Sequence, residues 1–367
     1  MAIDSPRVVA TISGPWPAPV ETLLPHQWSY WSFLRKMLSA AKGADAVILR
    51  GTSGFGAGYV EAVAGLLIKL RWRHPPLVLV SDATWDVTSQ ALEDRLPRFA
   101  RPLLPRLGRL GVRATDGRHV IYGVLSSDEK QGFEGRWGID GRRVRFTPFY
   151  ATLGRDLASS ATDGGYVFAG GNSYRDYDLL VKAVEGLDVP VRLASSWRPS
   201  QPLPPNVEVA SLPQDEYNRT MLGAGLMVVP LRPAARSAGQ QTYLSAMLAG
   251  KPLIVTDAPG VRDYVVPGQT ALVVENDPEA LRAAITWVLD PANKAEVQLM
   301  TERARRTVEE QYLARHYFAR LWETATQEAA TQEAATQEAA TQEAATQEAA
   351  SRARAGDGAA GPTPGNI

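Results

Sequence analysis

Polar residues and glycines gather at the start of a helix that the sequence predicts near residue 239. The stretch from Ser237 to Gly268 reads SAGQQTYLSAMLAGKPLIVTDAPGVRDYVVPG: a helix, a Gly-Lys-Pro stop, a strand and a Pro-Gly turn. Ser237 and Gly239 fall at the helix cap and first turn, where free N–H groups suit an anion such as a diphosphate. Thr242 and Ser245 lie within a turn of that end. The alternative is a plain capped helix that packs on a sheet.

A second stretch that could bind phosphate reads VFAGGNSYRDYDLL, at residues 167–180. Gly170 and Gly171 would let the main chain approach a phosphate closely, because glycine has no Cβ. The basic residue after them is Arg175, whose forked guanidinium suits a diphosphate. Arg175 could instead form a surface salt bridge with one of the two aspartates that follow it.

Those two aspartates, Asp176 and Asp178, also read as a D-x-D metal motif. They open a predicted helix behind a basic residue, which argues against a metal site there. The four histidines are scattered and lack the spacing of zinc ligands. We therefore expect no metal in this protein.

Two features of the first half point to a ligand cleft. The run Gly51–Gly58, GTSGFGAG, follows a predicted strand and precedes a predicted helix, like a phosphate-cradling loop, but it matches neither P-loop nor dinucleotide spacing. The alternative for this run is a flexible turn. Asp82 stands at the carboxyl end of a predicted strand, where side chains face the cleft in α/β proteins. It could equally cap a turn.

Short β-branched runs alternate with amphipathic stretches, a pattern typical of parallel α/β sheets. In the first half we expect strands at Arg7–Ser13, Ala46–Arg50, Leu77–Ser81, His119–Leu125 and Val144–Pro148. We expect helices at Gln27–Ala41, Gly58–Arg71, Ser89–Leu110 and Ser127–Trp137. Prolines must kink or break the third of these helices.

The small and polar stretch Thr152–Gly165 predicts a linker, after which a second alternating series begins. Its strands are expected at Tyr166–Ala169, Val191–Ala194, Val207–Ala210, Leu226–Pro230, Pro252–Thr256 and Ala271–Val274. Its helices are expected at Tyr177–Leu187, Asp215–Gly223, Gly239–Ala249, Pro278–Leu289, Asn293–Gln311 and Ala314–Trp322. Two series joined by one linker predict two lobes with a ligand cleft between them.

From Thr326 to Ala350 the chain consists of five copies of Thr-Gln-Glu-Ala-Ala. These residues favour helix, but five residues advance a helix by about 500°, so no apolar stripe forms. We expect a solvated helical spacer and then a disordered tail at Ser351–Ile367. The alternative is a helix that binds a partner.

Composition excludes several classes of protein. None of the 367 residues is cysteine, which excludes disulfides and thiolate metal sites. No apolar run approaches the roughly 18 residues of a membrane span, and the first 14 residues lack a signal-peptide core, so we expect a cytoplasmic protein. The net charge is zero, yet residues 1–155 hold 21 Lys and Arg against 13 Asp and Glu. This excess favours an anionic surface or substrate, or is an ordinary charged surface.

The basic charge is densest in a segment whose arginines alternate with apolar residues: Arg95, Arg98, Arg101, Arg106, Arg109, Arg113 and Arg118. Such a segment can lie on an anionic membrane surface, which would make the protein peripheral on the inner face of the cell membrane. The alternative is a solvated surface. No nucleic-acid-binding motif accompanies the arginines, so we expect no nucleic-acid partner.

The stretch after Ser237 resembles the donor-binding core of family-four (group 1) glycosyltransferases, which have the two-lobed GT-B fold. Their pattern is a glutamate, seven residues, a second glutamate and Ala-Met-x-x-Gly-x-Pro, and Ala246–Pro252 matches its second part. Asp263 stands where the family has a glutamate in the turn that follows. The residues at 167–180 resemble the family's strand, Gly-rich loop and basic residue, with Arg175 in place of lysine.

The resemblance implies two Rossmann-like lobes around a nucleotide-diphosphate-sugar, whose sugar passes to an acceptor hydroxyl with retention and without a metal or other cofactor. The acceptor would be a glycan, a lipid or a small molecule. The chain would divide into an acceptor lobe at 1–152, a donor lobe at 153–311, a crossover helix at 312–325 that returns to the first lobe, and the repeats with their tail at 326–367.

The resemblance also implies site residues. The donor would contact Gly170, Gly171, Asn172, Arg175, Ser237, Gly239, Gln240, Gln241, Thr242, Ser245 and Asp263. Arg175 would in addition stabilise the departing diphosphate, and Asp82, at the place of the family's His-Asp strand end, would contact the acceptor hydroxyl.

The chain departs from the family at both motif glutamates, whose positions Ser237 and Ser245 occupy. In the family the first glutamate contacts the donor sugar and the second the ribose, and serine brings a hydrogen bond without charge. The family's earlier arginine is also replaced, by Gly171 or Asn172. We expect altered donor recognition, either of a different donor sugar or with Gln240 and Gln241 as substitutes for the glutamates. The alternative is a catalytically degenerate relative that binds a ligand or scaffolds a partner.

Overall fold

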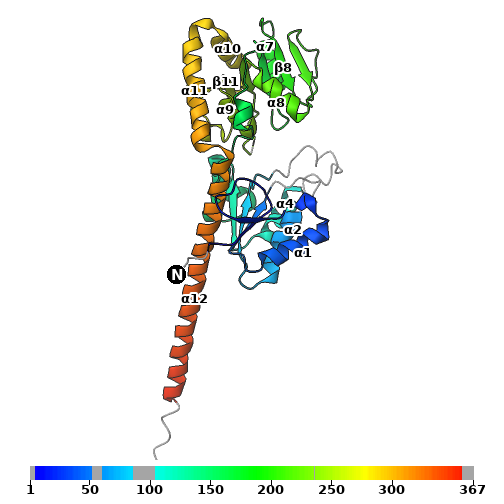
Figure 1. Cartoon of the computed structure of the whole chain (residues 1–367). Helices are drawn as coiled ribbons and strands as arrows, with labels where there is room; N and C mark the ends of the chain where they lie inside the picture. The colour runs from blue at the N-terminus through cyan, green and yellow to red at the C-terminus, as the bar shows by residue number, and fades with distance from the viewer. Residues whose placement is uncertain (1–4, 52–59, 86–103, 235, 358–367) are drawn as a thin grey trace, which may run out of the picture.

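The computed structural model describes residues 5–51, 60–85, 104–234 and 236–357 (Figure 1). These residues form two lobes, each built around a parallel sheet of six strands. The expected α/β class with two Rossmann-like lobes is confirmed. Each lobe follows from the alternation of buried strands with amphipathic helices, because a parallel sheet needs a crossover between its strands.

The N-terminal lobe has the strand order β2-β1-β3-β4-β5-β6. Its strands are β1 (Val8–Ala10), β2 (Val20–Thr22), β3 (Ala46–Arg50), β4 (Leu77–Ser81), β5 (Val120–Val124) and β6 (Val144–Phe146). Its helices are α1 (Tyr30–Ala41), α2 (Val60–Arg71), α4 (Leu104–Thr115) and α5 (Ser127–Trp137), with short 3-10 turns at Pro25–Gln27 and Gly141–Arg143. The edge strand β2 was not expected from the sequence, since its three residues lie just after a proline-rich run.

The N-terminal sheet is buried on both faces. In β3, Val47 and Leu49 pack against the cluster formed with α1 and α2, whereas Ala46 and Ile48 face the opposite cluster. This alternation follows from the two-residue period of a strand. The opposite cluster contains Phe318 and other side chains of the last helix, so this helix belongs to the N-terminal lobe's core.

The C-terminal lobe has the strand order β12-β11-β10-β7-β8-β9. Its strands are β7 (Val167–Gly170), β8 (Val191–Ala194), β9 (Val207–Ala210), β10 (Leu226–Val229), β11 (Leu253–Thr256) and β12 (Leu272–Val274). Its helices are α6 (Arg155–Ala158), α7 (Tyr177–Val184), α8 (Gln214–Leu222), α9 (Gln240–Leu248), α10 (Pro278–Leu289) and α11 (Lys294–Gln311), with 3-10 turns at Val261–Asp263 and Pro291–Asn293. The chain passes between the lobes twice, and Ala151 N–H donates to the Tyr312 carbonyl at 2.8 Å where the two passages meet.

The last helix, α12 (Ala314–Asp357), runs without interruption from the lobe junction along the N-terminal lobe and beyond it (Figure 1). Leu321 and Ala325 are fully buried against the N-terminal sheet. The expectation that the repeats are wholly solvated is wrong at their start, because Glu328 forms an ion pair with Arg145 and Gln332 donates to the Pro75 carbonyl at 3.0 Å. From residue 333 to residue 349 every side chain is exposed.

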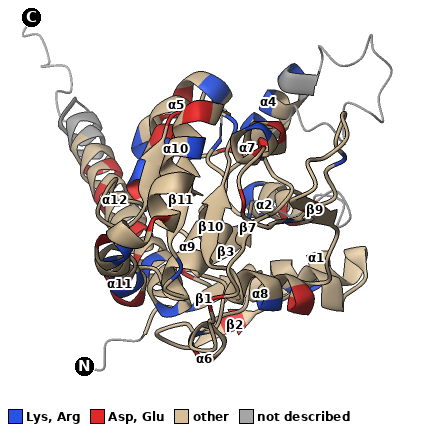
Figure 2. Cartoon of the chain, turned by 90° about the horizontal axis from the view of Figure 1, so that it is seen from above, with Lys and Arg blue, Asp and Glu red and all other residues tan. Residues whose placement is uncertain are grey.

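The helix also extends into the segment that was expected to be disordered. The backbone of α12 stays helical to Asp357, so the helical part of the tail is longer than the composition suggested. Glutamate is the only charged residue type in the repeats, which are seen from above in Figure 2.

Candidate active site

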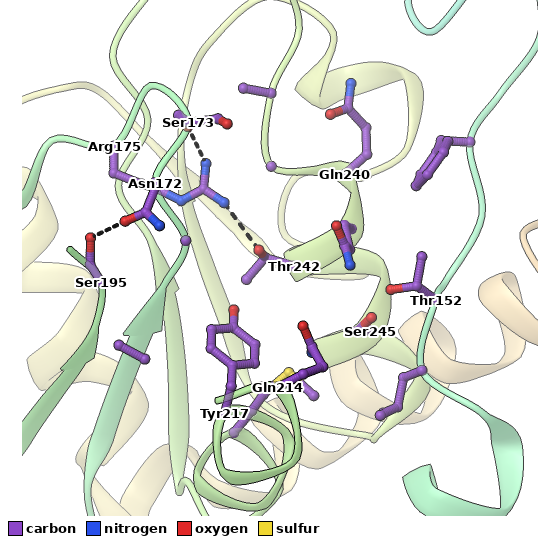
Figure 3. Close-up of a pocket in the computed structure, with 18 of the residues that line it drawn as sticks. Thr152, Asn172, Ser173, Arg175, Ser195, Gln214, Tyr217, Gln240, Thr242 and Ser245 are labelled. Atoms are coloured by element: carbon purple, nitrogen blue, oxygen red, sulfur yellow. Dashed lines mark hydrogen bonds between the residues drawn. The ribbon is translucent and has the colours of Figure 1, made fainter. Parts of the chain in front are cut away.

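A pocket of about 650 Å³ lies between the two lobes. The C-terminal lobe lines it with the loops after β7 and β8 and with the first turns of α8 and α9 (Figure 3). The N-terminal lobe contributes Arg50, Asp82, Leu125 and Phe149. This is the edge at which the carboxyl ends of parallel strands meet, which is where α/β proteins bind ligands.

Arg175 is the most deeply buried cation in the wall of this pocket, with 9% of its surface exposed. Its Nη1 donates to the Ser173 carbonyl at 2.7 Å and its Nη2 to Thr242 Oγ1 at 3.0 Å (Figure 3). Its Nε donates to the Gly170 carbonyl at 3.0 Å. Burial lowers the pKa of Arg175 from its usual value, but a guanidinium stays charged. Within the described residues no carboxylate lies within 4.0 Å of it.

The surface salt bridge considered for Arg175 is therefore wrong. Asp176 and Asp178 instead lie 3.6 and 3.5 Å from Arg232 on the outer surface. Asp176 also caps α7, because its carboxylate accepts from the Leu179 N–H at 3.1 Å. No group of three or more His, Asp or Glu residues that could hold a metal ion occurs in the part of the chain that the structure describes.

The loop after β7 brings its main chain close to Arg175. Gly171 has a φ of +102°, and a Cβ there would lie 3.0 Å from Arg175 Nη2. Gly170 does not line the pocket; it lies behind the wall, where a Cβ would come within 2.4 Å of the Tyr217 ring. Asn172 lines the pocket, and its Oδ1 accepts from Ser195 Oγ at 2.7 Å. The lack of a Cβ thus serves two purposes: at Gly171 it leaves space on the pocket side of the loop, and at Gly170 it lets the main chain pack closely on Tyr217.

Helix α9 points its first turn into the same pocket. It begins after Gly239, which has a φ of +89° and provides no side-chain cap. Thr242 and Ser245 line the pocket one turn apart, and Ser237 lies before the helix, where its Oγ accepts from Gln240 Nε2 at 2.5 Å. Gln241 is exposed in the pocket. This first turn thus offers main-chain N–H groups and neutral side chains, but no carboxylate.

Asp82 enters the pocket from the N-terminal lobe. It has a φ of +51°, an uncommon conformation for a residue other than glycine, and only 6% of it is exposed. Its Oδ1 accepts from the Tyr317 hydroxyl of α12 at 2.6 Å. Burial raises the pKa of Asp82, although the Tyr317 hydrogen bond and the charge of Arg50 oppose this.

A second cavity of about 400 Å³ adjoins the first within the N-terminal lobe. The two cavities share Arg50, Asp82 and Phe149. Four aromatic residues from two segments line the second cavity, together with polar groups that include His26 and Glu61: Phe149, Tyr150, Tyr317 and Phe318. Asp82 therefore lies at the passage between an anion-attracting pocket and an aromatic one.

The prediction that Asp263 contacts the donor needs correction, because Asp263 does not line the interlobe pocket. Its Oδ2 accepts from the Ser127 N–H and its Oδ1 from Ser127 Oγ, both at 2.7 Å. Ser127 is the first residue of α5 in the other lobe, so a carboxylate at this helix start is also favoured by the helix dipole. Asp263 connects the lobes.

The next two residues of α5 contact the C-terminal lobe as well. Asp128 Oδ2 accepts from the Gly260 N–H at 2.7 Å, and Glu129 Oε1 accepts from the Ser237 N–H at 3.1 Å. Gly260 permits this docking, since a Cβ there would lie 2.7 Å from the Cβ of Ser126, which caps α5 in the other lobe. Burial raises the pKa of Glu129, which is 3% exposed. Three consecutive residues at one helix start thus hold the lobes together beside α9.

Two pocket-lining arginines were missed by sequence reasoning, Arg50 at the end of β3 and Arg236 before α9. Neither stands in a recognisable motif, so the only signal was the basic charge itself. Residues 52–58 of the glycine run and three of the seven arginines of the basic segment, those at 95, 98 and 101, lie outside the described residues. In the described part of the chain no helix is long and apolar enough to cross a membrane.

Comparison with protein families and with curated proteins gives two matches. Residues 177–291 match the family model of group 1 glycosyl transferases. The GDP-mannose-dependent alpha-mannosyltransferase of Mycolicibacterium smegmatis (strain ATCC 700084 / mc(2)155) is 27% identical over 297 residues, which cover 79% of this chain and 69% of that protein.

Solved structures share the two-lobed fold. A glycosyltransferase from Rickettsia africae ESF-5 has a TM-score of 0.57 at 13% identity, with 84% of this chain and 85% of that chain covered. WaaG, a glycosyltransferase involved in lipopolysaccharide biosynthesis, has a TM-score of 0.55 at 14% identity, with 87% and 98% covered. HepE from Anabaena, in complex with UDP and glucose, has a TM-score of 0.54 at 14% identity, with 86% of each chain covered.

Proposed function

We propose that this chain, which is a group 1 glycosyltransferase with the GT-B fold, holds a nucleotide-diphosphate-sugar in the interlobe pocket and transfers the sugar to an acceptor hydroxyl. The observation that carries the proposal is Arg175, a buried guanidinium in the pocket wall without a carboxylate partner among the described residues. A buried charge is costly unless it is paired, so this arginine calls for an anionic ligand.

The diphosphate would lie between Arg175 and the first turn of α9. Gly171 leaves room for it on one side, and the uncapped N-terminus after Gly239 offers N–H groups and a favourable dipole on the other. Ser237, Gln240 and Ser245 would then face the sugar and ribose hydroxyls. These neutral side chains can donate and accept hydrogen bonds, which supports altered recognition rather than a degenerate protein.

The reaction would break the bond between the anomeric carbon and the phosphate oxygen and form a bond from that carbon to the acceptor oxygen, whose proton would pass to the departing diphosphate. The diphosphate leaves with the electrons of the broken bond, so cations and N–H groups that stabilise its charge lower the barrier. Retention of the anomeric configuration and independence from metal are part of the proposal, as the family resemblance implies. The lobe contacts of α5 would keep water out of the closed site.

The acceptor would enter through the second cavity, with Asp82 at the passage to the donor. Aromatic walls with a few polar groups suit a saccharide or a lipid-linked saccharide, since sugar rings present both C–H faces and hydroxyl groups. The chain division follows the same reasoning, with an acceptor lobe at 1–152 and a donor lobe at 153–311.

An anionic membrane surface is the proposed partner of the N-terminal lobe, at the inner face of the cell membrane. Helices α1, α2 and α4 are neighbours, and their sequences contain seven Lys and Arg residues but only one acidic residue, Glu61, which is buried. Each helix also exposes at least one large apolar side chain, and the most exposed on each are Trp31 at 73%, Leu70 at 70% and Leu110 at 62%. Basic charge with exposed aromatic and apolar groups suits a bilayer interface.

Liposome co-sedimentation tests the membrane surface. The protein should pellet with vesicles that contain anionic lipid at low salt and much less with neutral vesicles or at high salt. Leu70→Ala should weaken pelleting, whereas Leu299→Ala, a change at a residue 52% exposed on α11, should not. Equal pelleting with neutral and anionic vesicles, or none with either, would contradict the proposal.

Isothermal titration calorimetry tests the donor site. The GDP-mannose-dependent relative makes GDP the first ligand to titrate, and the UDP complexes of HepE make UDP the second. We expect one of the two to bind at a single site and the corresponding nucleotide-sugar to be hydrolysed slowly without acceptor. A protein that binds neither diphosphate would be a scaffold rather than a transferase.

A further inference from the structure

Arg236 is a partly buried cation in the wall of the interlobe pocket, immediately before Ser237. Its Nε is buried and has no hydrogen-bond partner in the described structure. Within the same described residues no carboxylate lies within 4.0 Å of its guanidinium. A buried N–H donor without an acceptor is rare in folded proteins, so a missing acceptor is expected at this point of the pocket.

The other arginine of the same loop behaves differently. Arg232 is exposed and has Asp176 and Asp178 as ion-pair partners on the outer surface. Two arginines four positions apart therefore point to opposite sides of the loop, one paired outside and one unpaired inside. This contrast indicates that the inward position of Arg236 is specific to the pocket rather than a property of the loop.

The aromatic ring of Tyr174 packs against the Arg236 guanidinium. The Arg236 guanidinium lies 5.1 Å from the centre of the Tyr174 ring, a cation–π distance. Tyr174 has a φ of +53°, and it shares this conformation with only Asp82 among the described residues other than glycine. Such strain persists where the surrounding structure requires it, often at functional sites. Tyr174 therefore contacts one pocket arginine with its ring and directly precedes the other, Arg175, in the chain.

The positive charge of Arg236 acts on Glu129 of the other lobe, where it opposes the rise in the pKa of that carboxyl, but the two groups form no ion pair within the described residues. The two oxygens of Glu129 accept from the main-chain N–H groups of Ser237 and Leu125, at 3.1 and 3.0 Å. Glu129 therefore orients the Arg236–Ser237 segment toward the lobe junction and leaves the guanidinium available to a ligand.

We propose that Arg236 supplies the second positive charge for the donor, and that it contacts the phosphate that bears the sugar. A nucleotide-sugar carries one negative charge on each of its two phosphates, and Arg175 provides one cation on the C-terminal side. Arg236 lies on the side of the pocket that meets the N-terminal lobe, where Asp82 is located. The sugar-bearing phosphate must face that side, since its bond to the sugar is the one that breaks. This assignment rests on the proposed function.

The test compares nucleoside mono- and diphosphates on Arg236→Ala, with Arg232→Ala as the matched control. Calorimetry uses GDP and GMP, or UDP and UMP if the wild type prefers uridine. We expect Arg236→Ala to weaken diphosphate binding by about tenfold to about a hundredfold, the effect of one charge-assisted hydrogen bond, and to leave monophosphate binding within about twofold. Arg232→Ala should change neither value.

Kinetics give a second, independent readout. If Arg236 stabilises the departing phosphate, Arg236→Ala should lower kcat with the nucleotide-sugar as well as raise KM, and Arg236→Lys should restore part of kcat because it restores the charge. Unchanged diphosphate affinity, or an equal loss for mono- and diphosphate, would overturn the assignment. A wild type that binds no nucleotide would refute the proposed function itself, whereas normal wild-type binding with an unaffected variant refutes only the role of Arg236.

Discussion

Replacing Arg175 by alanine should remove most of the affinity for the nucleoside diphosphate. Arg175 is 9% exposed and its guanidinium donates three hydrogen bonds, so the guanidinium is already positioned before a ligand arrives. A charge-assisted contact to phosphate contributes about 1.5–3 kcal/mol, which corresponds to a loss of about tenfold to about a hundredfold in affinity.

Thermal unfolding in the presence of the diphosphate makes this loss visible. A ligand at 100 times its Kd stabilises the wild type by about 2.7 kcal/mol, but the same concentration stabilises a variant that binds fiftyfold more weakly by only about 0.65 kcal/mol. At about 2–4 °C per kcal/mol, the Tm should rise by about 5–11 °C for the wild type and by about 1–3 °C for Arg175→Ala.

The ligand-induced shift is the quantity to compare, because the free variant should also be less stable. Alanine leaves the Gly170 carbonyl without the donor it has in the wild type, and an unsatisfied buried acceptor costs about 1–3 kcal/mol. Arg219→Ala is the matched control, since it removes an exposed arginine from α8 of the same lobe. A shift in Arg175→Ala equal to that of the wild type and of Arg219→Ala would refute the reasoning.

Three further predictions concern the N-terminal lobe and the lobe junction. Asp82→Asn should lower kcat yet raise the free energy of unfolding at pH 7. Burial raises the pKa of Asp82, so its charged form destabilises the fold above the ordinary pKa of an aspartate. The gain in the free energy of unfolding should therefore vanish near pH 3, as urea titrations at both pH values will show. Asp263→Ala should remove two hydrogen bonds to Ser127 and cost about 1.5–3 kcal/mol or more, with a raised donor KM; an unchanged urea midpoint and KM would show that the junction does not depend on it. A chain that ends at Ala335 should unfold at the wild-type Tm, whereas one that ends at Ala325 should unfold several degrees lower, because it loses the contacts of the first repeats with the N-terminal lobe; equal Tm values for the two chains would exclude a structural role of those repeats.

The strands and helices were largely predictable because their signals are local. Leu77–Ser81 and Val191–Ala194 appear in the structure with the expected bounds, since buried β-branched runs between turn residues leave few alternatives. The short strand Val20–Thr22 was missed for the converse reason: three residues carry no periodicity.

The pocket was partly predictable from the same local signals. Gly171 and Gly239 both adopt left-handed φ values, as expected of glycines placed for close approach, and both line the pocket with Arg175. Asp263 shows the limit of motif matching. It occupies the position of a family glutamate in the sequence, but its carboxylate accepts hydrogen bonds from Ser127, which is 136 positions away.

The sequence by itself determined which segments form strands and helices and where loops with phosphate-binding character begin, because those properties depend on neighbouring residues. Only the tertiary structure decided how the two lobes meet. That meeting buries Glu129 against Ser237 across 108 positions and joins Tyr317 of the last helix to Asp82. It also leaves the Nε of Arg236 without a hydrogen-bond partner among the residues that the structure describes. Such contacts depend on the relative position of two sheets, and no periodicity or spacing along the chain encodes that position.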